Sequence, residues 1–304
     1  IDENILVVED MQPYRTRKVR ILNGAHTTMV PFSILFGNET VKETVDHEFT
    51  GTFVKDAIFK EIIPTLKSKY NTDMMIANGE NATSGYGLSK KDAEELFSSG
   101  LDLLTLGNHA WDQRDMLSYI EENPKIIRAL NYPDGVPGKG YYKLELLNGK
   151  KIIVVQVMLR LFMNLSLDDP FKGIIEFLQK EKLGSTCDAI IIDMHGEATS
   201  EKKAFGYYVD GQVTAVLGTH THVPTADSVI LPKGTAYQTD VGMSGDYNSI
   251  IGFDINNPIH GFVKGYRAEG RFTPATENIT VCGALIEIDT NTGLAKNITP
   301  IQET

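Results

Sequence analysis

The sequence predicts an α/β protein built on a layered sheet with helices on both faces, and three observations lead to this class. Short apolar runs rich in β-branched and long aliphatic residues recur along the 304-residue chain. Amphipathic segments of helical length separate these runs. Each run closes on a glycine or a polar cluster, and continuous apolar runs between helices are typical of strands that are covered on both faces.

Four apolar runs are expected to be strands. They are residues 73–81 (DMMIANGEN), 103–109 (LLTLGNH), 189–195 (AIIIDMH) and 214–222 (TAVLGTHTH). Five amphipathic segments are expected to be helices, namely residues 56–70, 89–99, 113–122, 171–182 and 199–209. The tail, residues 264–304, predicts extra antiparallel strands with an Asn-Thr-Gly turn. Because ligands gather beyond the carboxyl ends of strands in such sheets, the four polar ends are expected to converge at one edge.

The composition limits the classes of partner. A formal net charge of −11 disfavours a long nucleic acid, because the chain would repel a polyanion, whereas a small anion responds to its local site. Cys187 and Cys282 predict buried, reduced thiols and no disulfide framework. The most apolar stretch, residues 152–163, is too short to span a bilayer, and the acidic start IDEN lacks the features of a secretory signal. We therefore expect a cytoplasmic protein with no membrane partner.

Side chains that bind metal ions close the predicted strands. They are Glu80 and Asn81, Asn108 and His109, His195, and His220 and His222. In an extended segment His220 and His222 point to the same side, so they can serve one ion or two adjacent ions. Oxygen and nitrogen ligands without a thiolate suit Fe, Mn or Zn. A carboxylate such as Glu80 can bridge two ions, and two ions about 3.5–4 Å apart clamp a phosphoryl group and acidify a shared water.

The segment LGNHAWDQRD (106–115) adds candidates for proton transfer. Asn108 is a neutral, weak ligand, which suits a site that must accept an anionic substrate. His109 projects to a different side and is free to donate a proton to a leaving alkoxide. Asp112 either orients His109 or caps the helix expected to start near Gln113, and the sequence leaves both readings open.

Three further acids lie near the predicted ligands. Asp193 and Glu197 flank His195, and either one could hold its ring by a hydrogen bond or be a solvated strand-end or helix-start residue. Asp240, in the segment TDVGMSG, either touches the site or only shapes its own turn.

Five motifs in order resemble the YmdB-like metallophosphoesterases, a branch of the calcineurin-like superfamily. They are NGENATSGYGL, LGNHAWD, DMHGEATSEK, GTHTHVPTAD and ILPKGTAYQTDVGMSG, and the resemblance runs from about residue 56 to the C-terminus. It implies a four-layer α/β/β/α sandwich, two iron or manganese ions, and hydrolysis of cyclic nucleotides by a phosphodiesterase. The 2′,3′-cyclic type is expected, and the 3′,5′-cyclic type is an open alternative.

The resemblance also implies a role for each matching residue. Glu80 would bridge the two ions, while Asn108, His195 and His220 complete one ion, His222 belongs to the other, Asn81 lies beside the site, and His109 is the catalytic acid. A hydroxide bridging the ions would attack phosphorus in line. The expected partner is a small phosphodiester. A homo-oligomer is also possible, because related proteins are often oligomeric.

The first 55 residues depart from this family, whose pattern begins with a strand ending in Gly-Asp. They resemble the mannitol and altronate (tagaturonate) dehydrogenases, because Lys18, Asn23 and His26 match the motif Lys-x4-Asn-x2-His. We expect a dehydrogenase-like segment over residues 1–55, arising from an insertion, a fusion or an artefact, and a metallophosphoesterase domain over residues 56–304. If the segment is an insertion, Asp10 could replace the missing aspartate ligand.

Two other functions compete with the dinuclear phosphodiesterase. One is a catalytically impaired protein that binds metal or nucleotide, because the first ligand strand is altered. The other is an NAD-dependent hexonate dehydrogenase, which would need a nicotinamide site. The sequence has no strand followed by G-x-G-x-x-G, so no such cofactor site is expected.

Overall fold

The computed structural model describes residues 65–266, 270, 272–275 and 279–303. The chain divides into two compact units, of which one comprises Ile1–Met75 with Glu95–Leu101 and the other comprises Ile76–Glu94 with Asp102–Thr304. In the first unit residues 65–70 are helical, as expected for the end of the segment 56–70. All predicted site residues from Glu80 onward belong to the second unit. Four residues singled out in the sequence lie outside the described residues, namely Asp10, Lys18, Asn23 and His26.

A small parallel sheet carries the first two polar strand ends. It contains strands β1 (Ile76–Asn78), β2 (Leu103–Thr105) and β3 (Ile126–Ile127) in that order. Strand β2 is buried along its whole length, as its continuous apolar sequence predicts. Because β1 and β2 are parallel neighbours, the chain leaves both strands at the same edge, where Glu80 and Asn108 follow.

The larger sheet has six strands in the order β4-β5-β6-β7-β9-β8. Their bounds are β4 Tyr141–Glu145, β5 Lys151–Met158, β6 Ala189–His195, β7 Ala215–Thr219, β8 Val229–Ile230 and β9 Ala236–Gln238. Strands β5, β6, β7 and β9 are parallel, and β4 and β8 pair antiparallel at the two edges. The register pairs His195 with Thr219. His195 and His220, the residue after Thr219, therefore reach the same edge of this sheet.

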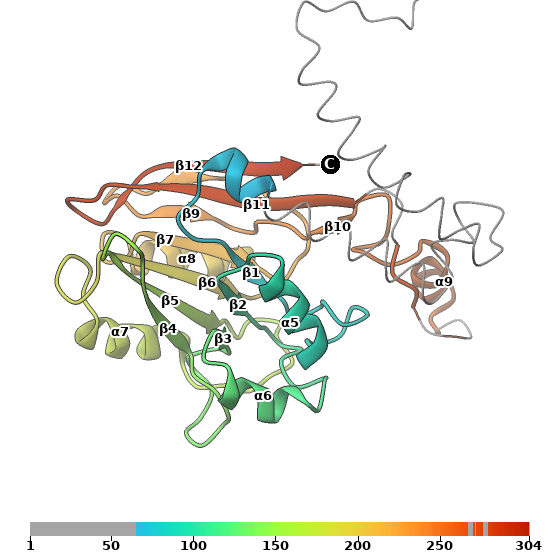
Figure 1. Cartoon of the computed structure of the whole chain (residues 1–304). Coiled ribbons are helices and arrows are strands. Elements are labelled where there is room, and N and C mark those ends of the chain that lie inside the picture. The colour runs from blue at the N-terminus through green and yellow to red at the C-terminus, as the bar shows by residue number, and fades with distance from the viewer. Residues whose placement is uncertain (1–64, 267–269, 271, 276–278, 304) are drawn as a thin grey trace, which may run out of the picture. The chain divides into compact units, whose positions relative to one another are not determined.

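The apolar stretch 152–163 supplies most of β5, which is buried from Ile152 to Met158. Helices α7 (Pro170–Lys180) and α8 (Thr199–Tyr208) pack on the larger sheet (Figure 1). Their buried side chains form one core with those of β5 and β6. Asp169 begins α7 by accepting hydrogen bonds from the backbone N–H groups of Phe171 and Lys172. Within the described residues, no helix has the length and apolar character needed to cross a membrane.

The remaining helices are α5 (Lys90–Ser98), α6 (Met116–Glu122) and α9 (Asn256–Lys264). The predicted tail strands are present as β11 (Ile279–Ile288) and β12 (Ala295–Glu303), which pair antiparallel, while β10 (Gly245–Asp246) pairs with β11 (Figure 1). The tail strands begin later than expected, since Lys264 ends a helix. The α/β class predicted from the sequence is confirmed.

Candidate metal centre

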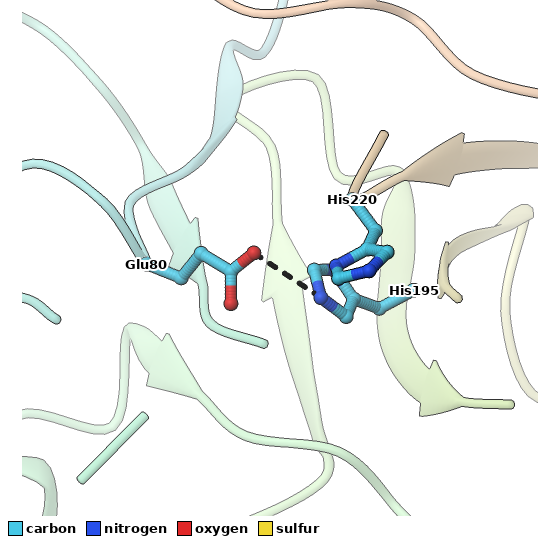
Figure 2. A group of neighbouring side chains, drawn as sticks. All are labelled: Glu80, His195 and His220. Atoms are coloured by element: carbon cyan, nitrogen blue, oxygen red, sulfur yellow. Dashed lines mark ion pairs between the residues drawn. The ribbon is translucent and has the colours of Figure 1, made fainter. Parts of the chain in front are cut away.

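Three side chains from distant parts of the sequence meet at the common edge of the sheets. Glu80 follows β1, His195 ends β6 and His220 follows β7, and one ligand atom from each lies within 4.8 Å of the others (Figure 2). Glu80 Oε1 is 3.1 Å from His195 Nε2, and the centroids of the two imidazole rings are 4.9 Å apart. Glu80 and His195 are almost wholly buried, so their polar atoms face one another away from bulk water.

Hydrogen bonds fix the tautomer of His195. The Thr219 hydroxyl donates to Asp193 Oδ1 at 2.6 Å, so it accepts a hydrogen bond from His195 Nδ1, which is 2.9 Å away. Burial lowers the pKa of His195 well below its usual value, and the nearby His220 adds to this effect, so the ring is neutral. With its proton on Nδ1, the ring presents the lone pair of Nε2 to the other members of the site.

Oxygen atoms surround that lone pair. Asn108 Oδ1 lies 2.9 Å from His195 Nε2, and Glu80 Oε1 lies 3.1 Å from it. Three electron-rich atoms therefore converge on one point, an arrangement that a cation relieves. Oxygen and nitrogen donors without a thiolate are the ligands of Fe, Mn and Zn, so the residues fit a transition-metal ion.

The surroundings of the Glu80 carboxyl group change its pKa. Burial raises its pKa to about 8, although the His109 backbone N–H, which donates to Oε2 at 3.2 Å, works in the opposite direction. Without a cation the carboxyl therefore holds a proton at neutral pH. A metal ion would take the place of that proton, because carboxylate ligands bind metals in the ionised form.

His222 and Asn81 form a second pair. His222 Nδ1 donates to the Ile251 carbonyl at 3.1 Å, which leaves Nε2 to accept from Asn81 Nδ2, also at 3.1 Å. The expectation that His220 and His222 share an extended strand is wrong. Strand β7 ends at Thr219, and both histidines have positive φ angles, +107° and +67°. The directions of the two side chains are therefore set by a loop with positive φ angles, and not by the alternation of a strand.

His109 lies at the rim with Asp112. Its Nδ1 is 2.7 Å from Asp112 Oδ2, and the ring also meets Tyr86 edge-on at 5.5 Å between centroids. Helix α6 has Asp115 at its N-cap, so the alternative that Asp112 caps this helix is wrong. Because Nδ1 faces Asp112, Nε2 is the ring nitrogen of His109 that points away from this carboxylate.

The acids near the predicted ligands take separate partners. Glu197 lies 3.2 Å from His220 Nε2, although the sequence suggested a contact with His195. Asp193 reaches His195 only through Thr219, as described above. Sequence reasoning missed Thr219, because a threonine at the end of a strand gives no sign that it links an acid to an imidazole.

Gly107 was also missed, and the site requires it to be glycine. A Cβ atom at this position would stand 2.0 Å from Glu80 Oε2 and 2.5 Å from His195 Cε1. We expect Gly107→Ala to displace both side chains and to weaken metal binding about 10- to 100-fold, the range found when the support of a metal ligand is disturbed. Isothermal titration with Mn²⁺ would measure the loss. Gly283→Ala is the control, because a Cβ there meets nothing within 4 Å, and equal affinity in the two variants would contradict the expectation.

The fold and the site define a class of protein, a metallophosphoesterase, which is an enzyme that hydrolyses phosphoesters. A solved structure of a novel phosphatase from Mycoplasma pneumoniae matches 81% of this chain and 88% of its own, with 36% identity and a TM-score of 0.74. The chain belongs to the YmdB-like protein family, whose sequence model matches residues 54–301. It is similar to a 2′,3′-cyclic-nucleotide 2′-phosphodiesterase of Bacillus subtilis (strain 168), with 45% identity over 239 residues, which cover 79% of this chain and 88% of that protein.

A second match covers the start of the chain. The model of the mannitol dehydrogenase C-terminal domain matches residues 10–76. The altronate oxidoreductase of Bacillus subtilis (strain 168) is 48% identical over 73 residues, which make up 23% of this chain and only 15% of that protein. Both resemblances seen in the sequence are thus confirmed, and the dehydrogenase match is a small piece of a much longer enzyme.

Proposed function

We propose that the chain is a phosphodiesterase that opens 2′,3′-cyclic nucleotides with the help of two transition-metal ions, iron or manganese. The observation that carries the proposal is the meeting of Glu80, Asn108, His195 and His220, whose oxygen and nitrogen donors face one point. The relative named as a 2′,3′-cyclic-nucleotide phosphodiesterase supports the choice of substrate. Activity on 3′,5′-cyclic nucleotides is a further outcome that the same assay would test.

The residues divide the work of the site. Glu80, Asn108, His195 and His220 would hold one ion, and Glu80 would share a second ion with His222 and Asn81. When bound, such a pair supplies Lewis acidity and lowers the pKa of a water that the ions share. Asn108 and His195 are uncharged, so Glu80 is the only anion among the four residues that would hold the first ion. The ion would therefore keep a net positive charge, which attracts the phosphodiester anion.

His109 would protonate the leaving ribose oxygen. Asp112 holds its Nδ1 from the opposite side, so the ring is oriented before substrate arrives. The partial exposure of both side chains, 33% and 44%, suits a group that meets a substrate entering from solvent. His109 would thus donate one proton to the leaving oxygen, and the carboxylate of Asp112 would hold the imidazole ring in the orientation that this transfer needs.

We assign this chemistry to a domain over residues 56–304 and none of it to a dehydrogenase. The dehydrogenase-like segment spans 15% of the altronate oxidoreductase that it resembles, which is too little to include a nicotinamide site. The two family models overlap over residues 54–76, and we place the boundary within that overlap. Asp10 stays a candidate ligand for the second ion.

Metal analysis and two assays of the full chain test the proposal. We expect about two ions per chain, as a dinuclear clamp requires, with hydrolysis of 2′,3′-cyclic AMP and of bis(p-nitrophenyl) phosphate. One ion and no hydrolysis would instead indicate an impaired protein that only binds metal or nucleotide. Reduction of NAD with a hexonate would indicate the dehydrogenase, and either result would refute the proposed function.

A further inference from the structure

A fully buried lysine lies behind the metal-binding loop and takes no part in the chemistry above. Lys202 is in helix α8 and has no exposed surface. Its Nζ donates to the Thr219 carbonyl at 2.8 Å and to Asp240 Oδ2 at 2.9 Å. Asp240 is 1% exposed, so both charges of this ion pair have been taken out of water. Such a pair is weak evidence for stability, because desolvation offsets the attraction between the charges.

The ion pair holds the backbone on both sides of His220. Lys202 binds the carbonyl of the preceding residue, Thr219, while Asp240 Oδ2 accepts the N–H of the following residue, Thr221, at 3.0 Å. The other carboxylate oxygen, Oδ1, accepts the N–H of Gly242 at 2.9 Å. Two charged side chains therefore fix the peptide groups on either side of one metal-ligand residue.

That residue needs such support. His220 has a φ of +107° and His222 one of +67°, and residues other than glycine seldom adopt positive φ angles. Conformations of this kind persist only where the surrounding structure determines them strongly. In a relaxed loop the His220 imidazole would turn away from Glu80 and His195.

We propose that Lys202 and Asp240 are positioning residues, which hold the loop 219–222 in its strained conformation so that His220 and His222 face the metal site. This rests on the proposed function only in taking a metal ion as the ligand. The sequence leaves open whether Asp240 touches the site or only shapes its own turn. In this proposal Asp240 acts on the site through its hydrogen bond to the loop 219–222. In the sequence TSEKK, Lys202 resembles an exposed helix lysine, so its pattern does not distinguish it from Lys203.

Lys202→Met in the full chain tests the proposal, and Lys203→Met is the matched control. Lys203 is the next residue of the same helix and forms an ion pair of the same length, 2.9 Å, with Asp227. That pair is partly exposed, and the hydrogen bonds of Asp227 go to Lys203, Thr225 and Thr239, which lie outside 219–222. In metal-free protein we expect Lys202→Met to speed hydrogen exchange of the peptide covering 219–222 at least tenfold. We also expect it to weaken Mn²⁺ binding about 10- to 100-fold. The control should match the wild type in both measurements.

A second variant separates positioning from folding. Lys202→Met leaves Asp240 buried without its partner, which destabilises the fold by itself. Adding Asp240→Asn removes the unpaired charge, so the thermal midpoint should recover while the fast exchange and weak Mn²⁺ binding remain. Recovery of both properties in the double variant, or equal exchange in the two lysine variants, would overturn the proposal. If the wild type binds no Mn²⁺, the proposed function fails, but the exchange measurement still decides this inference.

Discussion

Glu80→Gln is expected to remove nearly all phosphodiesterase activity, by about 10³-fold or more, which exceeds the 10- to 100-fold typical of residues that only support a ligand. The substitution keeps the shape of the side chain and removes the charge that would be shared between the ions. The Glu80 carboxyl is buried and close to His195 and Asn108, so the substitution removes the charge at the point where these donor atoms meet. Metal content after gel filtration, measured beside the turnover of 2′,3′-cyclic AMP, should show both losses together.

Folding does not explain this expected loss. Without a metal ion the Glu80 carboxyl is already neutral at pH 7, so the neutral amide of Gln adds no cost of burial, and the metal-free variant should melt no lower than the metal-free wild type. Glu201→Gln is the control, since Glu201 accepts the backbone N–H groups of Arg160 and Leu161 and lies outside the metal cluster. A Glu80→Gln variant that retains two ions and its turnover would show that Glu80 does not bridge the metal ions.

His109→Asn should reduce turnover of 2′,3′-cyclic AMP by about 10² to 10⁴-fold, the range for loss of a general acid, with metal content unchanged. The loss should depend on the leaving group. The ribose alkoxide needs a proton, whereas p-nitrophenolate leaves without one, so bis(p-nitrophenyl) phosphate should lose only about tenfold or less. Rates on the two substrates, measured with the same preparation, give this comparison directly.

Asp112→Asn completes the test of the acid. An amide still accepts a hydrogen bond from His109 Nδ1 but no longer stabilises the protonated ring, so a smaller loss on the cyclic nucleotide is expected, about 10-fold. Equal losses on the two substrates in the His109 variant would mean that the histidine binds the phosphoryl group and does not protonate the leaving oxygen.

Much of the fold could be predicted because strand ends and helices leave local signals. The runs 189–195 and 214–222 contain β6 and β7, and the amphipathic segment 199–209 contains α8. Strand β5 was missed, because a continuous apolar run between a turn and a loop does not distinguish a strand from other buried segments. Short strands such as β8, with two residues, carry too little pattern to be recognised.

In the site, too, features that depend on local sequence could be predicted, and features that depend on contacts between distant segments could not. Glu80, His195 and His220 could be predicted to meet, because each follows or ends a strand of the sheets. The roles of Thr219, Gly107 and Lys202 could not, since each depends on which atoms lie opposite it in space. The positive φ angles of His220 and His222 were hidden for a similar reason: the Lys202–Asp240 pair that accompanies them is assembled from two separate segments.

The most direct test of the proposed metal centre is anomalous diffraction from crystals of the full chain grown with Mn²⁺. We expect an anomalous peak about 2.0–2.3 Å from donor atoms of Glu80, Asn108, His195 and His220, and a second peak about 3.5–4 Å away beside His222. Peaks only at surface carboxylates, with His195 Nε2 bound to no ion, would contradict it.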